Sequence, residues 1–152
     1  LAQARLEVLG TSGYPDATFS LRLSYGPVMG FKKRGQPVPA FTTVAGLYER
    51  ATGAEPFDLP QSWLRAQSKL DPSTPFCMVS RLDTIGGNSG SPVVDKSGAL
   101  VGLNFDSSPA QLGGDYGYEP IDGRNIAVHS SIILEALDKV YDARRLVKEL
   151  RP

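Results

Sequence analysis

The sequence has 152 residues, of which 41% are hydrophobic and 21% are charged, and this composition is typical of a single globular domain with a sizeable core. Sixteen basic residues balance sixteen acidic ones, so the net charge near zero gives no electrostatic reason to expect nucleic acid or an anionic membrane surface as a partner. Because the sequence starts with Leu1, without a signal peptide or an apolar stretch long enough to span a bilayer, we expect a soluble segment of a longer protein.

The first part of the sequence predicts a helix followed by a strand. Apolar residues recur at helical spacing over residues 1–9, and Gly10 is placed to end that helix. After a turn signal at residues 13–16, residues 19–25 alternate apolar and polar side chains, which is typical of a half-buried strand. The basic run at residues 32–35 fits a solvated hairpin tip better than a binding patch, because three basic residues are too few for a patch.

Short helices are expected next, over residues 42–52 and 60–70, and the second carries the only tryptophan, Trp63. From residue 76 onward, short apolar runs separated by Gly, Asp and Asn predict hairpin-rich β-structure. These runs cover residues 76–79, 91–94, 100–105 and 125–128. Apolar residues at helical spacing over residues 131–150 predict an amphipathic helix or a helix pair. The expected fold class is mainly β with flanking helices.

The sequence offers little for metal or redox chemistry. Cys77 is the only cysteine, so it cannot form an internal disulfide, and its apolar neighbours predict a small buried side chain. One histidine, one cysteine and no carboxylate cluster at ligand spacing give no support for a metal site. We therefore expect chemistry without a cofactor.

The run Gly86-Gly87-Asn88-Ser89-Gly90-Ser91-Pro92 is the most informative part of the sequence. A nucleophilic serine needs an exposed hydroxyl and two backbone N–H groups directed at the developing oxyanion. Glycines on both sides of Ser89 permit the positive φ angles that turn such N–H groups inward. We predict that Ser89 is the nucleophile and that the N–H groups of Gly87 and Ser89 form the oxyanion hole, as in the Gly-x-Ser-Gly-x-Pro pattern of chymotrypsin-like peptidases.

Two other interpretations of this run compete with a nucleophilic serine. One is a glycine-rich hairpin turn without chemistry, which the residues alone leave open. The other is a phosphate-binding loop, which is disfavoured because the run lacks a Lys followed by Ser or Thr and precedes a strand signal where a helix is required.

Further runs along the chain resemble one peptidase family. They are residues 14–26, 41–43, 46–50, 90–93 and 102–106, with the sequences YPDATFSLRLSYG, FTT, GLYER, GSPV and GLNFD. On these residues the sequence resembles the exported bacterial dipeptidyl-peptidases 7 and 11, serine peptidase family 46, a branch of the chymotrypsin clan. The matching runs are spread over nearly the whole chain.

The resemblance implies a double β-barrel with an inserted helical domain, in a homodimeric enzyme of the periplasm or cell surface that removes dipeptides from free peptide N-termini. Residues 1–10 are then expected to end the inserted helical domain. Residues 11–130 are expected to form the second, C-terminal barrel, and residues 131–152 a C-terminal helical segment.

Acyl transfer by Ser89 also requires a general base, normally a histidine oriented by a carboxylate. The only histidine, His129, lies forty positions after Ser89 (129 minus 89), whereas the chymotrypsin-like order places histidine and aspartate before serine. Since the resembling family usually carries Asp at this position, we expect a structural or surface role for His129. The base and its carboxylate would then precede Leu1, and this chain alone is expected to be inactive.

By the same resemblance, Phe105, Asp106 and Ser107 line the substrate site. Family members that cut after Asp or Glu have Arg at the position of Ser107, so a small neutral residue there implies a pocket for apolar or uncharged side chains. Asp106 is expected to hold the substrate end with Phe105 as a wall, although an ordinary turn aspartate explains it nearly as well. We interpret Asp115 as a structural turn residue.

The function predicted for the intact protein is therefore serine-dependent release of dipeptides from peptide N-termini. The alternative belongs to a different class, a non-catalytic peptide-binding or assembly domain that keeps a protease-like barrel without a working triad. A His and an Asp encoded upstream of Leu1 would favour the enzyme.

Overall fold

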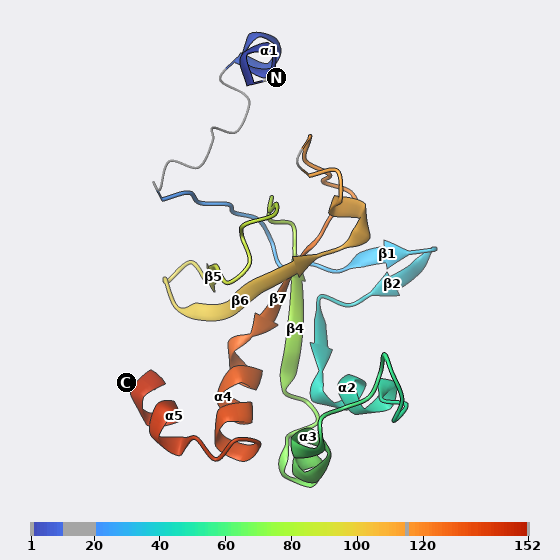
Figure 1. Cartoon of the computed structure of the whole chain (residues 1–152), viewed down its shortest axis with the longest axis vertical. Helices are drawn as coiled ribbons and strands as arrows, with labels where there is room; N and C mark the ends of the chain where they lie inside the picture. The colour runs from blue at the N-terminus through green and yellow to red at the C-terminus, as the bar shows by residue number, and fades with distance from the viewer. Residues whose placement is uncertain (1, 11–20, 115, 152) are drawn as a thin grey trace.

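The computed structural model describes residues 2–10, 21–114 and 116–151, and its centre is an antiparallel five-stranded sheet (Figure 1). The strand order is β3-β4-β7-β6-β5. In that order the strands are β3 (Phe41–Thr43), β4 (Pro75–Ser80), β7 (Asn125–His129), β6 (Leu100–Ser107) and β5 (Pro92–Val94). Because β7 pairs with both β4 and β6, the last strand of the chain joins the β3–β4 pair to the β5–β6 hairpin.

The strands follow the apolar runs of the sequence, as predicted. In the middle of the sheet, Val128 of β7 lies opposite Cys77 of β4 on one side and Leu103 of β6 on the other. Gly102 is required where β6 crosses β7, because a Cβ atom there would lie 2.6 Å from the carbonyl oxygen of Val128. The pairing of β6 with β7 therefore depends on a residue without a side chain.

The hydrophobic core lies where the helices meet one end of the sheet. The helices at the core are α2 (Val44–Arg50), α3 (Gln61–Ala66), the 3-10 turn η2 (Gln67–Lys69) and α4 (Ser130–Lys139). The helix α5 (Arg144–Leu150) follows α4 and contributes none of its residues to this core. The buried core residues are Val44, Ala66, Leu70 and Ile132, with Tyr48, Trp63, Phe76, Val128 and Val140 packed against them. The hydroxyl of Tyr48 donates to the carbonyl oxygen of Trp63 at 2.7 Å, which joins α2 to α3. The predicted short helices and the C-terminal helix pair are confirmed.

Two further local predictions are also confirmed. The basic run forms the tip of a hairpin between β1 (Phe31–Lys33) and β2 (Gln36–Val38), with positive φ angles of 51° at Arg34 and 79° at Gly35. The helix α1 (Ala2–Leu9) ends at Gly10, where φ is 54°. In the described part of the chain, no helix is both long and apolar enough to cross a bilayer.

The strand predicted over residues 19–25 is wrong for the part that the structure describes. Residues 21–25 form no strand, and the side chains of Leu21, Leu23 and Tyr25 are 99%, 79% and 87% exposed. Alternation of apolar and polar residues marks a segment suited to a sheet, but a strand also needs ladder pairing with a second strand, which alternation alone does not supply. The turn expected at residues 13–16 lies outside the described residues.

A buried arginine fastens residues 29–30 to the rest of the fold. Arg124 is only 3% exposed, and its guanidinium donates to the carbonyl oxygens of Met29, Gly30, Ile121 and Gly123 at 2.6–3.3 Å. The carbonyl groups satisfy the buried N–H groups that would otherwise cost free energy. Residues 29–30 are thereby held beside the turn that leads into β7.

Candidate active site

The chain turns tightly between β4 and β5, and Ser89 lies in this turn. Gly87 and Gly90 have φ angles of 103° and 86°, a region that residues with a Cβ atom rarely adopt. Asn88 closes the turn, because its side-chain oxygen accepts from the N–H of Ile85 at 2.9 Å and its own N–H donates to the Ile85 carbonyl at 3.2 Å. The glycines predicted to permit an unusual backbone around Ser89 therefore adopt one.

Backbone N–H groups in this turn fall into two sets. Those of Asn88, Gly90 and Ser91 donate to carbonyl oxygens of the protein. Within the described part of the chain, the N–H groups of Gly87 and Ser89 donate to no protein acceptor. The two groups predicted as the oxyanion hole are thus left available for a ligand.

Ser89 borders a cavity of about 260 Å³. The lining residues come from the turn before β5, from the end of β6 and from the 3-10 turn η3 (Pro109–Gln111) with the residues after it. They are Thr84, Ile85, Gly86, Ser89, Asn104, Phe105, Asp106, Ser107, Gln111, Leu112 and Gly114. All three residues predicted for the substrate site are therefore brought to one cavity with Ser89. Its described lining contains no Lys or Arg, and its only carboxylate is that of Asp106.

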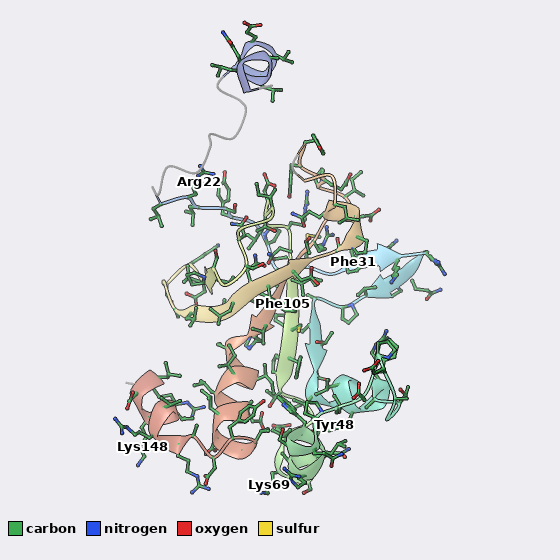
Figure 2. The ribbon with its side chains drawn as sticks, in the orientation of Figure 1. Arg22, Phe31, Tyr48, Lys69, Phe105 and Lys148 are labelled. Atoms are coloured by element: carbon green, nitrogen blue, oxygen red, sulfur yellow. The ribbon has the colours of Figure 1, made fainter. Side chains whose placement is uncertain are left out.

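A β-bulge at Phe105 shapes the wall of the cavity that β6 forms. Asn104 is paired with Ala127 and Asp106 with Ile126, so Phe105 is an extra residue without a partner on β7. Its carbonyl oxygen accepts from the hydroxyl of Ser89 at 3.4 Å. In Figure 2, Phe105 lies near one end of β4 and Tyr48 near the other, so the cavity and the hydrophobic core occupy opposite ends of the sheet.

Asp106 and Ser107 follow the bulge. Asp106 is exposed, and its carboxylate accepts from the N–H of Ser107 at 2.8 Å, a local contact that also suits a turn aspartate. Ser107 is partly buried and pairs with Asn125 of β7. Asp115, interpreted from the sequence as a turn residue, lies outside the described residues.

His129 caps the helix α4 and has no hydrogen bond to Ser89. Its Nδ1 atom accepts from the N–H of Ser131 at 3.1 Å, and its ring packs edge-on against Phe41 with centroids 5.9 Å apart. Burial lowers the pKa of His129 below its ordinary value, because the charged form is less well solvated there. This geometry agrees with the structural role expected for His129.

Sequence reasoning missed a buried polar cluster that forms part of the cavity lining and extends beneath it. Its members are Ser80, Thr84, Asn104, Gln111 and Asn125, each at most 8% exposed. Asn125 is completely buried, donates to the side chains of Asn104 and Thr84, and accepts from the hydroxyl of Ser80. The available signal was the presence of Asn104 within the apolar run 100–105, since a buried amide needs polar partners.

The structure gives no candidate ligand set for a metal ion. Among the described residues, no three His, Cys, Asp or Glu side chains gather in a way that would hold one. Cys77 was predicted to be buried, and it is only partly buried, because the face of β4 that carries it is incompletely covered. This burial raises the pKa of its thiol.

A turn that presents a serine hydroxyl beside free backbone N–H groups and a side-chain cavity is an arrangement typical of serine peptidases. The family model described as Peptidase S46 matches residues 1–152, and the chain belongs to the peptidase S46 family. The resemblance found in the sequence is therefore confirmed.

The chain is similar to relatives of two names. An Asp/Glu-specific dipeptidyl-peptidase of Shewanella putrefaciens is 38% identical, with 90% of this chain and 23% of the relative covered. A dipeptidyl-peptidase 7 of Porphyromonas endodontalis is 35% identical, with 89% and 18% covered. The crystal structure of Porphyromonas endodontalis DPP11 with the dipeptide Arg-Asp matches with a TM-score of 0.84 at 28% identity, covering 99% of this chain and 23% of that one. The chain thus spans about a fifth of the length of these relatives.

Proposed function

We propose that this chain is the nucleophile-bearing, C-terminal part of a serine dipeptidyl-peptidase. The observation that carries the proposal is the placement of Ser89 between two glycines of positive φ, at the edge of a cavity and beside unused N–H groups. Membership of the peptidase S46 family and the names of the relatives support the same activity.

In the proposed reaction, the Ser89 oxygen attacks the carbonyl carbon of the second substrate residue while a base takes the hydroxyl proton. The N–H groups of Gly87 and Ser89 donate to the oxyanion of the tetrahedral intermediate. The peptide C–N bond then breaks, the leaving amine takes the proton from the base, and the dipeptide stays on Ser89 as an ester. Water hydrolyses this ester and restores the hydroxyl.

The base is proposed to come from outside this chain. His129 is occupied as a helix cap, and no other histidine is present. A histidine and an aspartate from an upstream barrel would complete the triad in the order typical of chymotrypsin-like enzymes. On its own the chain would then keep the oxyanion donors and lack the group that activates Ser89.

The proposed architecture assigns residues 1–10 to the end of an inserted helical domain, 11–130 to the second barrel and 131–152 to a C-terminal helical segment. The antiparallel sheet, the preceding helix α1 and the pair α4 and α5 are compatible with this division. Homodimer formation and export to the periplasm or cell surface are part of the same proposal, and they rest on the family resemblance alone.

Specificity is proposed to follow from the lining of the cavity. A substrate carboxylate that enters a cavity whose described lining has no cation exchanges its hydration for neutral groups only, so Asp and Glu should be disfavoured as the second residue. Ser107 supplies a hydroxyl and no charge, which suits apolar or uncharged side chains. Because the named relatives include both Asp/Glu-specific enzymes and dipeptidyl-peptidase 7, this proposal rests on the residues of this chain.

Asp106 is proposed to bind the free N-terminus of the substrate. Its exposed carboxylate is the only one that lines the described cavity, and it lies one residue from the wall formed by Phe105. A carboxylate that binds the α-ammonium group would fix the substrate N-terminus relative to Ser89, and this would explain cleavage after the second residue.

The test is turnover of dipeptidyl reporter substrates by the full-length protein. Ser89→Ala should remove activity almost completely, by a factor on the order of a million. Ser97→Ala, in the exposed turn between β5 and β6, is the matched control and should leave activity unchanged. Full activity in Ser89→Ala would reject the proposal, and a wild-type protein that binds peptides without cleaving them would favour the non-catalytic alternative.

A further inference from the structure

Asn104 of β6 holds the nucleophile turn at three points. Its backbone carbonyl accepts from the N–H of Gly90 at 2.7 Å, and its backbone N–H donates to the carbonyl of Ser91 at 2.9 Å. Its side-chain Nδ2 donates to the carbonyl oxygen of Asn88 at 3.1 Å. The residues directly before and after Ser89 are therefore both bonded to one residue of the sheet.

The hydrogen bond from the Asn104 side chain matters because its acceptor, the Asn88 carbonyl, lies in the same peptide plane as the Ser89 N–H. The carbonyl of Asn88 and the N–H of Ser89 belong to the same planar trans peptide and point in opposite directions. Fixing the Asn88 carbonyl oxygen toward Asn104 therefore turns the Ser89 N–H away from the sheet. That N–H is one of the two proposed oxyanion donors.

A second bond to the Asn88 carbonyl has a different effect. The N–H of Ser91 donates to it at 3.0 Å, which closes the turn locally. A bond within the turn moves with the turn and does not fix its orientation against the rest of the molecule. The Asn104 amide is the side-chain contact that ties this peptide to the sheet.

The orientation of the Asn104 amide is itself determined by its neighbours. Its Nδ2 atom must face the Asn88 carbonyl, which only accepts, so its Oδ1 atom needs a donor on the other side. Asn125 Nδ2 supplies that donor, and Asn125 Oδ1 in turn accepts from the hydroxyl of Ser80 at 3.2 Å. Asn104 is 6% exposed and Asn125 is completely buried, so water does not compete readily for these bonds.

We propose that Asn104, oriented by Asn125, is a positioning residue that aims the Ser89 N–H at the oxyanion. This inference rests on the proposed role of Ser89 and goes beyond it, because it assigns a function to two buried amides at the cavity. Asn104 lines the cavity, but both ends of its amide are bonded to protein groups, so its effect is assigned to the peptide joining Asn88 to Ser89. Its effect should therefore appear in the transition state and not in ground-state binding.

The experiment compares Asn104→Ala with the parent in the full-length protein. We expect kcat to fall about 10- to 100-fold, somewhat less than the loss of a whole oxyanion donor, with KM changed by less than about threefold. Affinity for a dipeptidyl boronic acid, which forms a tetrahedral adduct with a nucleophilic serine, should fall in parallel with kcat. Affinity for the free dipeptide product should be unchanged.

Two comparisons separate positioning from general damage. Asn125→Ala leaves Asn104 in place without its donor and should show the same pattern, with a smaller loss. Thr74→Val is the control, because it removes a side-chain hydrogen bond to Glu135 at the start of β4, the end away from the cavity. The folded fraction of this variant should bind the boronic acid with unchanged affinity. If Asn104→Ala does not fold, the same criteria apply to Asn125→Ala.

The inference is overturned if kcat and boronic acid affinity are unchanged in the variants, or if boronic acid and product affinity fall equally. Failure of the proposed function looks different. In that case Ser89→Ala would retain activity and the parent would form no tetrahedral adduct.

Discussion

The hydroxyl of Ser89 donates to the carbonyl oxygen of Phe105 at 3.4 Å, across the turn before β5 and the bulge in β6. The bond is long for a hydroxyl donor, so little free energy is needed to break it. The Ser89 proton is therefore free to turn toward a base that reaches the cavity from another part of the protein. The bulge matters here because it places the Phe105 carbonyl opposite Ser89 without pairing Phe105 to β7.

Substituting Ser107 should change which substrates are cleaved. Ser107→Arg introduces a cation into a cavity whose described lining has none, so cleavage after Asp or Glu should rise relative to Leu or Phe by about tenfold or more. Turnover of the apolar substrates should fall, because the longer side chain fills space. The measurement is kcat/KM over a panel of dipeptidyl reporters that differ only in the second residue. A parent enzyme that already cleaves after Glu as well as after Leu would show that the proposed pocket is wrong.

Substituting Asp106 should weaken recognition of the substrate N-terminus. Asp106→Asn keeps the shape and the contact with the Ser107 N–H but removes the charge. We expect kcat/KM for free N-termini to fall about tenfold or more, because the substrate ammonium loses its partner. Substrates with an acetylated N-terminus, which we expect the parent to cleave poorly, serve as the control and should be unaffected. Equal losses on both kinds of substrate would contradict this role.

The cap of α4 should make stability depend on pH. Because burial lowers the folded-state pKa of His129 below its ordinary value of 6.5, the unfolded chain binds a proton at a higher pH than the folded one. The pKa difference stabilises the folded state. This stabilisation is complete above pH 6.5, and it is lost as the pH falls through the lower folded-state pKa of His129. Protonation also removes the acceptor for the Ser131 N–H and places a cation at the helix N-terminus.

The comparison that isolates this effect is His129→Asn. An asparagine also caps helices but does not titrate, so the difference in unfolding free energy between the parent and the variant should change below pH 6.5 and be constant above it. Chemical denaturation at several pH values measures the difference. A difference that stays constant down to pH 5 would show that His129 contributes no such dependence.

Removing the buried guanidinium should destabilise the fold without touching the cavity. Arg124→Met keeps the apolar stem but leaves the carbonyl groups of Met29, Gly30, Ile121 and Gly123 without their donor. We expect a loss of about 3 kcal/mol in the free energy of unfolding, the cost typical of buried polar groups left unpaired. Arg145→Met, on the exposed face of α5, removes a surface ion pair with Glu149 and should cost under about 1 kcal/mol. Similar losses in both variants would contradict the account.

The sequence predicted elements whose signals are local. The apolar runs 76–79 and 100–105, the hairpin tip at Gly35 and the helix pair after His129 each depend on neighbouring residues, and the structure contains them. The segment 21–25 was predicted wrongly because strand pairing depends on a partner distant in the sequence.

The candidate site likewise contains one feature with a local signal in the sequence and others that depend on residues distant in the sequence. The glycines around Ser89 are a local signal for a special turn, which the φ angles confirm. Asn104 and Asn125 are 21 residues apart, and only the register of β6 against β7 brings their amides together. The bulge at Phe105 also depends on that register, so neither feature was accessible from spacing alone.

Ser89 is proposed to be a nucleophile activated by a base outside this chain, and a fluorophosphonate probe tests this most directly. The probe should label the full-length protein stoichiometrically, peptide mapping should place the label on Ser89, and Ser89→Ala should prevent it. This chain expressed alone should label slowly or not at all, because oxyanion donors without a base recover only a small part of the rate. Full-length protein that stays unlabelled, or rapid stoichiometric labelling of the isolated chain, would contradict the claim.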